Sequence, residues 1–171
     1  MEETKLLSCN EDDLEIAAKL LRDGKIVGIP TETVYGLGAD ATNSKAVESV
    51  FKVKGRPADN PLIVHISGMD MLERIALDIP DLAYKLAEKF WPGPLTMVLK
   101  KRDTIPGVTS GGLDTVGIRM PSHPIIKRII ELAEIPIAAP SANISGYPSP
   151  TTAEHVMNDM AGKISVVVDG G

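Results

Sequence analysis

Helical and strand-like hydrophobic patterns alternate along almost the whole chain, and this alternation limits the possible folds more than any other feature. Apolar residues at helical spacing predict a helix over residues 11–24, and residues 25–30 read as a short buried strand. Further helices are expected at 43–55, 69–76, 79–90, 124–134 and 152–160, and further strands at 61–66, 95–101, 115–120, 136–139 and 163–171. Such alternation is typical of an α/β domain with helices on the faces of a sheet.

The connections between the expected strands predict a mixed sheet. No helix separates the strand at 95–101 from the strand at 115–120, so these two should pair antiparallel. The other crossovers contain helices and suit parallel pairing, so the sheet is expected to be mostly parallel. Residues 31–43 are expected to form an irregular loop.

The composition fits one domain, 1–171, in a reducing compartment. A chain of 171 residues, 43% of them hydrophobic, can bury one sizeable core, and two domains would be cramped. Cys9 is the one cysteine of the chain, so an internal disulfide is impossible and a structural zinc site is not expected. Because no apolar run approaches the length of a membrane span and the N-terminus lacks signal-peptide features, we expect a cytoplasmic protein without membrane association.

The first polar loop contains the spacing of a dinucleotide-binding motif. Gly36, Gly38 and Ala41 fit G-x-G-x-x-A, but such glycines must lie directly between a strand and a helix to reach a pyrophosphate. Here five residues follow Pro30 before the first glycine, which argues against a nicotinamide cofactor.

The same loop gathers hydroxyl side chains around one carboxylate, that of Glu32. The hydroxyl groups belong to Thr31, Thr33 and Tyr35. From the residues alone, a capped turn with a hydrogen-bonded tyrosine and a binding site are both consistent with this cluster.

A group of cations follows the helix expected at 43–55. Lys52 and Lys54 lie at the helix end, where cations interact favourably with the helix dipole. Arg56 precedes a proline, which favours an extended backbone, and an extended segment would point Lys54 and Arg56 to one side as a phosphate site requires. His65, on the next strand, fits either a hydrogen-bonded core residue or a site residue.

Two further places offer candidate site residues. Arg119 lies on an otherwise apolar strand, where its charge needs either a structural carboxylate or an anionic substrate group as a partner. Ser122 is expected to cap the helix at 124–134, and one threonine of the loop at 141–152 should cap the last helix. One cap does not explain all the polar residues of that loop, which are Ser141, Asn143, Ser145, Ser149, Thr151 and Thr152.

Several short motifs occur together in one order. They are PTETVYGLG, Lys54-Gly55-Arg56 as K-x-R, RPxxNPL, WPGPLT, Arg119-Met120-Pro121 as R-x-P, and Ser141-Ala142-Asn143 as S-x-N followed by SPT. This set, spread across nearly the whole chain, resembles the YrdC-like family of threonylcarbamoyl-AMP synthases. The resemblance implies an α/β domain with a twisted, mostly parallel sheet and a deep cationic groove.

The resemblance also implies an activity and the residues that serve it. The family joins L-threonine, bicarbonate and ATP into threonylcarbamoyl-adenylate and releases pyrophosphate, with Mg²⁺ carried by the ATP phosphates and no metal site of the protein itself. Partner enzymes then transfer the threonylcarbamoyl group to tRNA. By similarity, Thr33, His65 and Arg119 would bind L-threonine, and Lys54 and Arg56 would be the catalytic cations. The residues around ATP would be Lys54, Arg56, Asn60, Thr115, Ser141, Asn143 and Ser149.

Family members usually continue beyond the DGG sequence with further site residues, whereas this chain stops at Gly171. We therefore expect either a domain truncated at its C-terminus or an unusual short member.

A function of another class is a non-catalytic RNA-binding module for tRNA or double-stranded RNA. Its basic residues would be Lys52, Lys54, Arg56, Lys100, Lys101, Arg102, Lys127 and Arg128. The net charge of −5 and an aromatic content of 4% argue against it, because RNA-binding proteins need excess positive charge and aromatic platforms.

Overall fold

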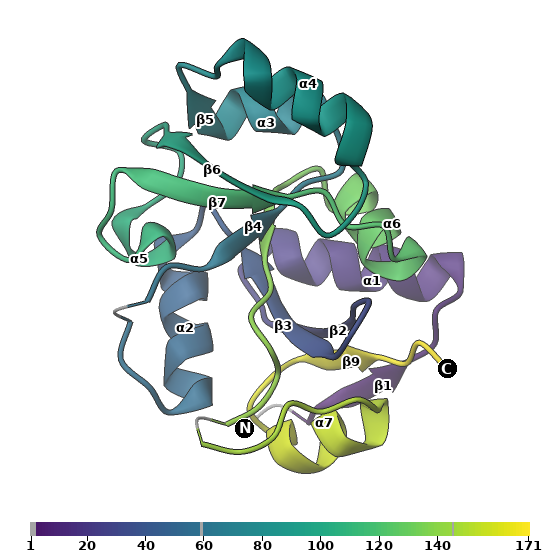
Figure 1. Ribbon diagram of the computed structural model, residues 1–171. Helices are drawn as coiled ribbons and strands as arrows, with labels where there is room; N and C mark the ends of the chain where they lie inside the picture. Colours follow the sequence, from purple (N-terminus) through teal and green to yellow (C-terminus); the bar gives the residue numbers. More distant parts are fainter. Residues whose placement is uncertain (1–2, 59, 145) are drawn as a thin grey trace.

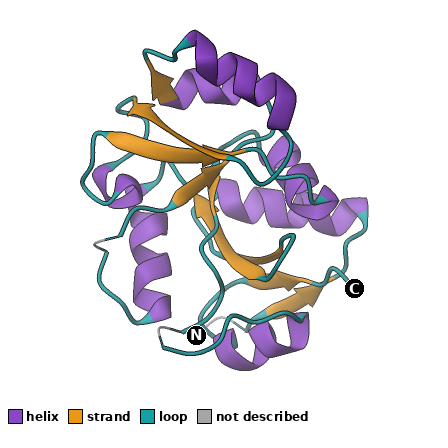
Figure 2. Cartoon of the chain, in the orientation of Figure 1, coloured by secondary structure: helices purple, strands orange, loops and turns teal. Residues whose placement is uncertain are grey.

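A mixed sheet runs through the middle of the molecule, and helices pack around it (Figures 1 and 2). The computed structural model describes residues 3–58, 60–144 and 146–171. The strands are β1 (Lys5–Leu7), β2 (Val27–Pro30), β3 (Tyr35–Asp40), β4 (Ile63–His65), β5 (Ala76–Leu77), β6 (Thr96–Lys101), β7 (Thr115–Arg119), β8 (Ile137–Ala138) and β9 (Val166–Val168). The helices are α1 (Glu11–Arg22), α2 (Ser44–Lys54), α3 (Met69–Ile75), α4 (Asp81–Phe90), α5 (Gly107–Ser110), α6 (Pro124–Ala133) and α7 (Ala153–Met160).

The strand order in the described sheet is β1-β9-β2-β3-β8-β4-β7-β6-β5. β9 pairs parallel with β1 and β2, and β4 pairs parallel with β7. The other pairs are antiparallel, including β6 with β7 as predicted. The mixed α/β sheet is therefore confirmed, but the expectation of mostly parallel pairing is wrong because β3 and β8 run antiparallel to their neighbours.

The expectation of an irregular loop after β2 is also wrong. Residues Tyr35–Asp40 form β3, all buried, and pair with β2 in a hairpin. A Cβ atom at Gly36 would lie 3.1 Å from the carbonyl oxygen of Ala139, so glycine permits this close approach of two backbones. Gly36 and Gly38 thus lie inside a strand and not at a turn between a strand and a helix.

Two hydrophobic clusters cover the sheet unequally. Helices α1, α3, α4 and α6, joined by Val47 and Phe51 of α2, form the larger cluster on one face of the sheet. On the opposite face, α2 and α7 cover only the half formed by β9, β2 and β3. Ile63 of β4 and Val98 of β6 are 45% and 67% exposed, so the described helices leave much of the other half open.

Side chains cap the N-termini of α2 and α6. Asn43 caps α2, and its Oδ1 accepts from the backbone N–H groups of Lys45 and Ala46. Helix α6 is capped by His123 and not by Ser122, because the Nδ1 of His123 accepts from the N–H of Ile125.

Two further expectations concern the last polar loop and membrane association. Thr152 caps α7 as predicted, whereas Ser145 lies outside the described residues. Within the described ranges, no helix has both the length and the apolar character needed to cross a membrane.

Candidate functional site

The open face of β4, β7 and β6 carries several of the predicted site residues. Along β7, Thr115, Gly117 and Arg119 point to this face while the intervening Val116 and Ile118 are buried. Arg119 pairs in register with His65 of β4. Two predicted threonine-binding residues therefore lie side by side at one end of the face.

Arg119 is held by two acceptors. Its Nε donates to the carbonyl oxygen of Gly93 at 3.0 Å, and its terminal NH2 nitrogen lies 3.1 Å from Oε2 of Glu32. The side chains of Arg119 and Glu32 are 22% and 25% exposed. The sequence left a structural carboxylate and a substrate anion open as partners of Arg119, and the structure provides the carboxylate.

Glu32 reaches Arg119 from the turn between β2 and β3. Its Oε1 accepts from the N–H of Ser122 at 2.9 Å, from the hydroxyl of Ser122 at 3.3 Å and from the N–H of His123 at 3.0 Å. Partial burial raises the pKa of this carboxyl group, but the backbone hydrogen bonds, that from His123 foremost, and the charge of Arg119 together outweigh it, so the pKa lies below its usual value. Glu32 is therefore ionised at neutral pH.

His65 is almost fully buried, with 7% of its surface exposed. Its Nδ1 lies 3.3 Å from the carbonyl oxygen of Ile137, which can only accept, so Nδ1 carries the proton. Burial lowers the pKa of His65 to about 4, and the nearby charge of Arg119 acts in the same direction. The imidazole is therefore neutral at pH 7, and its Nε2 is an acceptor.

Thr33, the third predicted threonine ligand, is exposed on the turn that also carries Glu32. Thr31 closes this turn, because both its N–H and its hydroxyl donate to the carbonyl oxygen of Val34. The pair between Glu32 and Arg119 brings this turn to the end of β7.

A second group of predicted residues gathers at the end of α2. Lys54 is 1% exposed, and its Nζ donates to the carbonyl oxygens of Ser141 and Asn143, the latter at 2.9 Å. Burial lowers the pKa of Lys54 to about 8, and the charge of Arg56 contributes. Lys54 thus ties α2 to the loop that carries the S-x-N motif.

The predicted extended backbone around Gly55 is wrong. Gly55 adopts a left-handed conformation with φ of 70° and ends α2, so the segment from Lys54 to Arg56 is not extended. Arg56 stacks over the ring of Phe51 at 5.5 Å, and its buried Nε has no hydrogen-bond partner among the described residues. Asn60 lies further along the same loop and is exposed.

The S-x-N loop is internally hydrogen-bonded. The hydroxyl of Ser141 donates to Oδ1 of Asn143, and the hydroxyl of Ser149 lies 3.5 Å from the same oxygen. A bridge between Ser141 and Gly36 attaches the loop to β3. The structure therefore brings Lys54, Ser141, Asn143 and Ser149 together.

Thr115 is separate from both groups. It lies at the other end of β7 from Arg119, about 13 Å away at the usual rise of a strand, although it points to the same open face.

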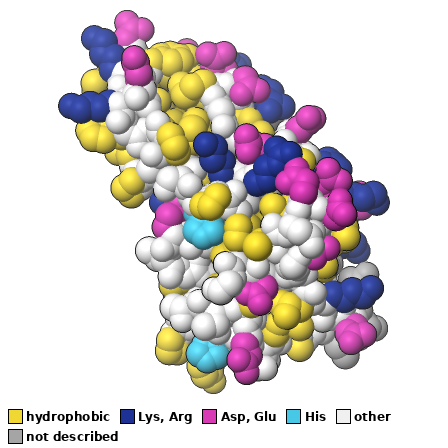
Figure 3. Space-filling model, turned by 90° about the vertical axis from the view of Figure 1, so that its right-hand side faces the viewer, with side chains coloured by type: hydrophobic (Ala, Val, Ile, Leu, Met, Phe, Trp, Pro, Cys, Tyr) yellow, Lys and Arg dark blue, Asp and Glu magenta, His cyan; other side chains and the backbone are white. Residues whose placement is uncertain are grey.

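The deep cationic groove implied by the resemblance is not shown. Lys54 is buried and Arg119 is paired, and Figure 3 shows basic and acidic side chains interspersed on one side of the molecule. Two basic residues of the RNA-binding alternative also have acidic partners, because Arg128 pairs with Glu11 and Lys100 pairs with Asp78. Among the described residues, no three or more His, Cys, Asp or Glu side chains are grouped to hold a metal ion.

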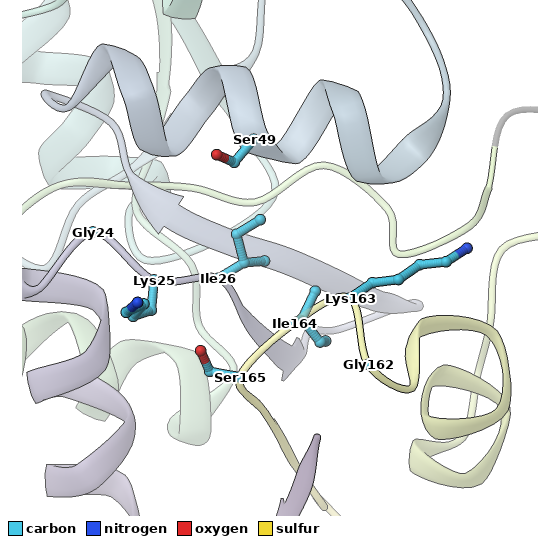
Figure 4. Close-up of a pocket in the computed structure, with 8 residues that line it drawn as sticks. All are labelled: Gly24, Lys25, Ile26, Ser49, Gly162, Lys163, Ile164 and Ser165. Atoms are coloured by element: carbon cyan, nitrogen blue, oxygen red, sulfur yellow. The ribbon is translucent and has the colours of Figure 1, made fainter. Parts of the chain in front are cut away.

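A pocket of about 310 Å³ lies apart from these groups (Figure 4). Lys25, Ser49 and Lys163 line it together with the turns after α1 and before β9, and the side chain of Lys163 extends away from the other labelled residues. It contains none of the predicted site residues.

Sequence reasoning did not identify the backbone acceptors of the site. The carbonyl groups of Gly93, Ile137 and Ser141 orient Arg119, His65 and Lys54, but a carbonyl group leaves no signal in the sequence. Glu32 did have a signal, because it was the carboxylate within a cluster of hydroxyl groups.

Comparison with known proteins assigns the family. The model of the Sua5/YciO/YrdC family, described as "Telomere recombination", matches residues 19–171. The chain belongs to this family. Members that resemble it include the threonylcarbamoyl-AMP synthase of Pyrococcus abyssi, 59% identical over 158 residues, and that of Bacillus subtilis, 51% identical over 169 residues. These matches cover 92% and 98% of this chain but only 46% and 49% of the two relatives, so the chain spans about half their length.

Solved structures of the Sua5/YciO/YrdC family share the fold. The crystal structure of P. abyssi Sua5 complexed with L-threonine superposes with a TM-score of 0.94 at 55% identity, covering 98% of this chain and 51% of that one. The structure of Escherichia coli YciO, at 20% identity and a TM-score of 0.84, covers 100% of this chain and 85% of its own and supports the fold alone.

Proposed function

We propose that this chain is the synthase domain of a threonylcarbamoyl-AMP synthase, which makes threonylcarbamoyl-adenylate from L-threonine, bicarbonate and ATP and releases pyrophosphate. The observation that carries the proposal is the pairing of Arg119 with His65 at the end of an open sheet face, beside the turn that holds Thr33. A structure 55% identical to this chain was crystallised with L-threonine.

Arg119, His65 and Thr33 would bind L-threonine. The bonds to Gly93 and Glu32 use the Nε–H and one terminal N–H of Arg119, so further N–H groups remain for the α-carboxylate of the amino acid. The neutral His65 presents Nε2 as an acceptor for a substrate N–H or O–H group.

Arg56, Asn60, Thr115, Ser141, Asn143 and Ser149 would surround ATP. Arg56 is the cation best placed for direct contact with phosphates, because its contact with Phe51 leaves its terminal N–H groups available. For Lys54 we propose a different role from the predicted phosphate contact, because carbonyl groups already take its donors. It would hold Ser141 and Asn143 in position.

The proposed reaction needs no nucleophile from the protein. The amine of threonine attacks carbon dioxide and loses a proton, or attacks bicarbonate with loss of water, and either route gives a carbamate. A carbamate oxygen then attacks the α-phosphorus, and the bond to pyrophosphate breaks so that pyrophosphate leaves. Catalysis then consists of positioning and charge stabilisation, which suits a site built from cations, hydroxyl groups and an amide. Mg²⁺ would enter on the ATP phosphates, and we assign it no ligand from the protein.

The product would pass to enzymes that transfer the threonylcarbamoyl group to tRNA, in the cytoplasm. The RNA-binding alternative and any direct contact with tRNA stay predictions.

A pyrophosphate-release assay with each substrate omitted in turn tests the proposal. Pyrophosphate should appear only when ATP, Mg²⁺, L-threonine and bicarbonate are all present. Release without threonine, or no release with all four, would refute the activity for this chain. A parallel titration with tRNA at increasing salt tests the alternative, because phosphate-backbone binding falls steeply as salt rises.

A further inference from the structure

Glu32 joins two segments that are distant in the sequence but adjacent at the proposed threonine site. It sits on the turn between β2 and β3, next to Thr33, and all its partners lie on Arg119 or in the loop between β7 and α6. Its Oε1 accepts from Ser122 and His123 while Oε2 faces Arg119. Both carboxylate oxygens therefore have partners that differ in kind: neutral donors for one and a guanidinium group for the other.

The carboxylate restricts the orientation of Arg119. The Nε–H of Arg119 is fixed by Gly93, and the NH2 group is fixed by Glu32. These two fixed points, together with the covalent attachment of the group at Cδ, restrict the plane of the guanidinium group and direct its remaining N–H groups. A single point would leave the group able to rotate.

The charge of Glu32 also compensates Arg119 when no substrate is bound. A guanidinium group that is only 22% exposed would be costly without an opposite charge. Because 22% of the Arg119 side chain stays exposed in the pair, a substrate anion can approach the guanidinium group without displacing Glu32.

From this geometry we propose that Glu32 is a positioning residue for threonine binding: it orients Arg119 toward the α-carboxylate and holds the turn that carries Thr33 beside it. The inference rests on the proposed function. Glu32 acts through Arg119 and the turn and does not itself contact the reacting atoms.

The test is Glu32→Gln, which retains the size of the side chain and one oxygen for Ser122 and His123 but removes the charge facing Arg119. Glu11→Gln is the matched control, because Glu11 forms an arginine–glutamate pair with Arg128 on the exposed surface. For both variants and the wild type, calorimetry measures the Kd for L-threonine and for ATP, thermal melts measure stability, and ¹H–¹⁵N spectra of the ligand-free proteins follow the Nε–H of Arg119.

We expect Glu32→Gln to weaken threonine binding about 10- to 100-fold, as when groups that orient a ligand contact are removed. The affinity for ATP should stay within about twofold, because the charge change is local to Arg119. The Arg119 Nε–H signal should shift or broaden in Glu32→Gln alone, and Glu11→Gln should match the wild type.

Three results would overturn the inference: threonine binding by Glu32→Gln equal to that of the wild type, an equal loss of ATP and threonine affinity, or a lowered melting temperature as the one change. Failure of the wild type to bind threonine would instead overturn the proposed function, and with it the threonine role of Glu32. The Arg119 signal in the ligand-free proteins reports on orientation independently of that outcome.

Discussion

Lys54 and Arg119 are both cations at the proposed site, but their surroundings differ in kind. Lys54 is 1% exposed and is surrounded by carbonyl dipoles, which take its donors. Arg119 is partly exposed, has one carboxylate partner and one carbonyl partner, and keeps N–H groups available. The ammonium group of Lys54 therefore holds a loop in place, whereas the guanidinium group of Arg119 still has donors for a ligand.

The difference shows that a cation in a motif is not thereby a ligand contact. In the sequence, the K-x-R and R-x-P motifs both suggest cations that bind an anion. In the structure, however, the N–H donors of Lys54 already bind carbonyl groups of the protein. The comparison therefore predicts opposite consequences for the loss of each cation: lost stability at Lys54 and lost affinity at Arg119.

The largest expected effect is on threonine binding by Arg119→Ala. Loss of a guanidinium group that pairs with the substrate carboxylate should weaken threonine binding by about 2 to 5 kcal/mol. The melting temperature should fall only modestly, because the pair with Glu32 is partly exposed. Calorimetric titrations of threonine and ATP, together with a thermal melt, measure both effects.

Arg119→Lys is the control for Arg119→Ala, since lysine keeps the charge but not the planar fork, and it should restore binding only in part. If Arg119→Ala kept its threonine affinity but lost much of its stability, Arg119 would be a structural residue like Lys54. The proposed difference between the two cations would then be wrong.

At Lys54 the expected effect is on folding. Lys54→Met keeps the length of the apolar stem but removes the ammonium group, which leaves the carbonyl groups of Ser141 and Asn143 without their donor and should cost about 3 kcal/mol of unfolding free energy. Urea denaturation measures this loss. Lys52→Ala, on an exposed position of the same helix, is the control and should change stability by less than about 0.5 kcal/mol.

Arg56→Ala tests the same difference between a structural and a ligand-binding cation at the proposed ATP site. It should weaken ATP binding by about 1.5 to 3 kcal/mol while the stability changes little. If Lys54→Met folded with wild-type stability and lost only ATP affinity, Lys54 would be a phosphate ligand after all.

The smallest expected effect is a loss of folding stability at acidic pH, caused by His65. Burial, with a contribution from Arg119, lowers the pKa of His65 to about 4 in the folded protein, whereas an unfolded chain protonates its histidine near the ordinary value of 6.5. The unfolded state therefore binds the proton first as the pH falls, so the stability contribution is complete above pH 6.5 and is lost toward pH 4. Between pH 7 and pH 5 this should remove about 1 to 2 kcal/mol.

Urea denaturation at a series of pH values checks the acid effect, with His65→Asn as the control because asparagine does not titrate. The slope of stability against pH between 6.5 and 5 should be smaller in His65→Asn. Equal slopes in the two proteins would mean that His65 has the same pKa in the folded and the unfolded state.

The sequence predicted the helices well because their apolar spacing reflects the same burial that the structure shows, as for Leu14 and Leu21 of α1. It failed at β3, where YGLGAD is buried on every residue and so has no alternation, and where two glycines resemble a turn. It also gave no prediction for β1, whose three residues pair with a distant strand.

For the site, some residues of the motifs lie together in the structure, as Arg119 does with His65, but their hydrogen-bond partners were beyond prediction. The pairing of Lys54 with Ser141 depends on how α2 lies against a loop 87 residues further along the chain. The left-handed conformation of Gly55 was foreseeable from its place at a helix end, but the proline that follows Arg56 favoured the extended alternative.

The position of β9 between β1 and β2 determines when this sheet can be completed. Lys5 pairs with Val166, so β1 has no place in the sheet until β9 has been synthesised and inserted between two strands from the beginning of the chain. Contacts of such long sequence separation make folding slow, and they leave the edges of β1 and β2 exposed on the ribosome in the meantime. During synthesis, β2 therefore depends on its hairpin with β3, and that hairpin also carries Glu32 and Thr33.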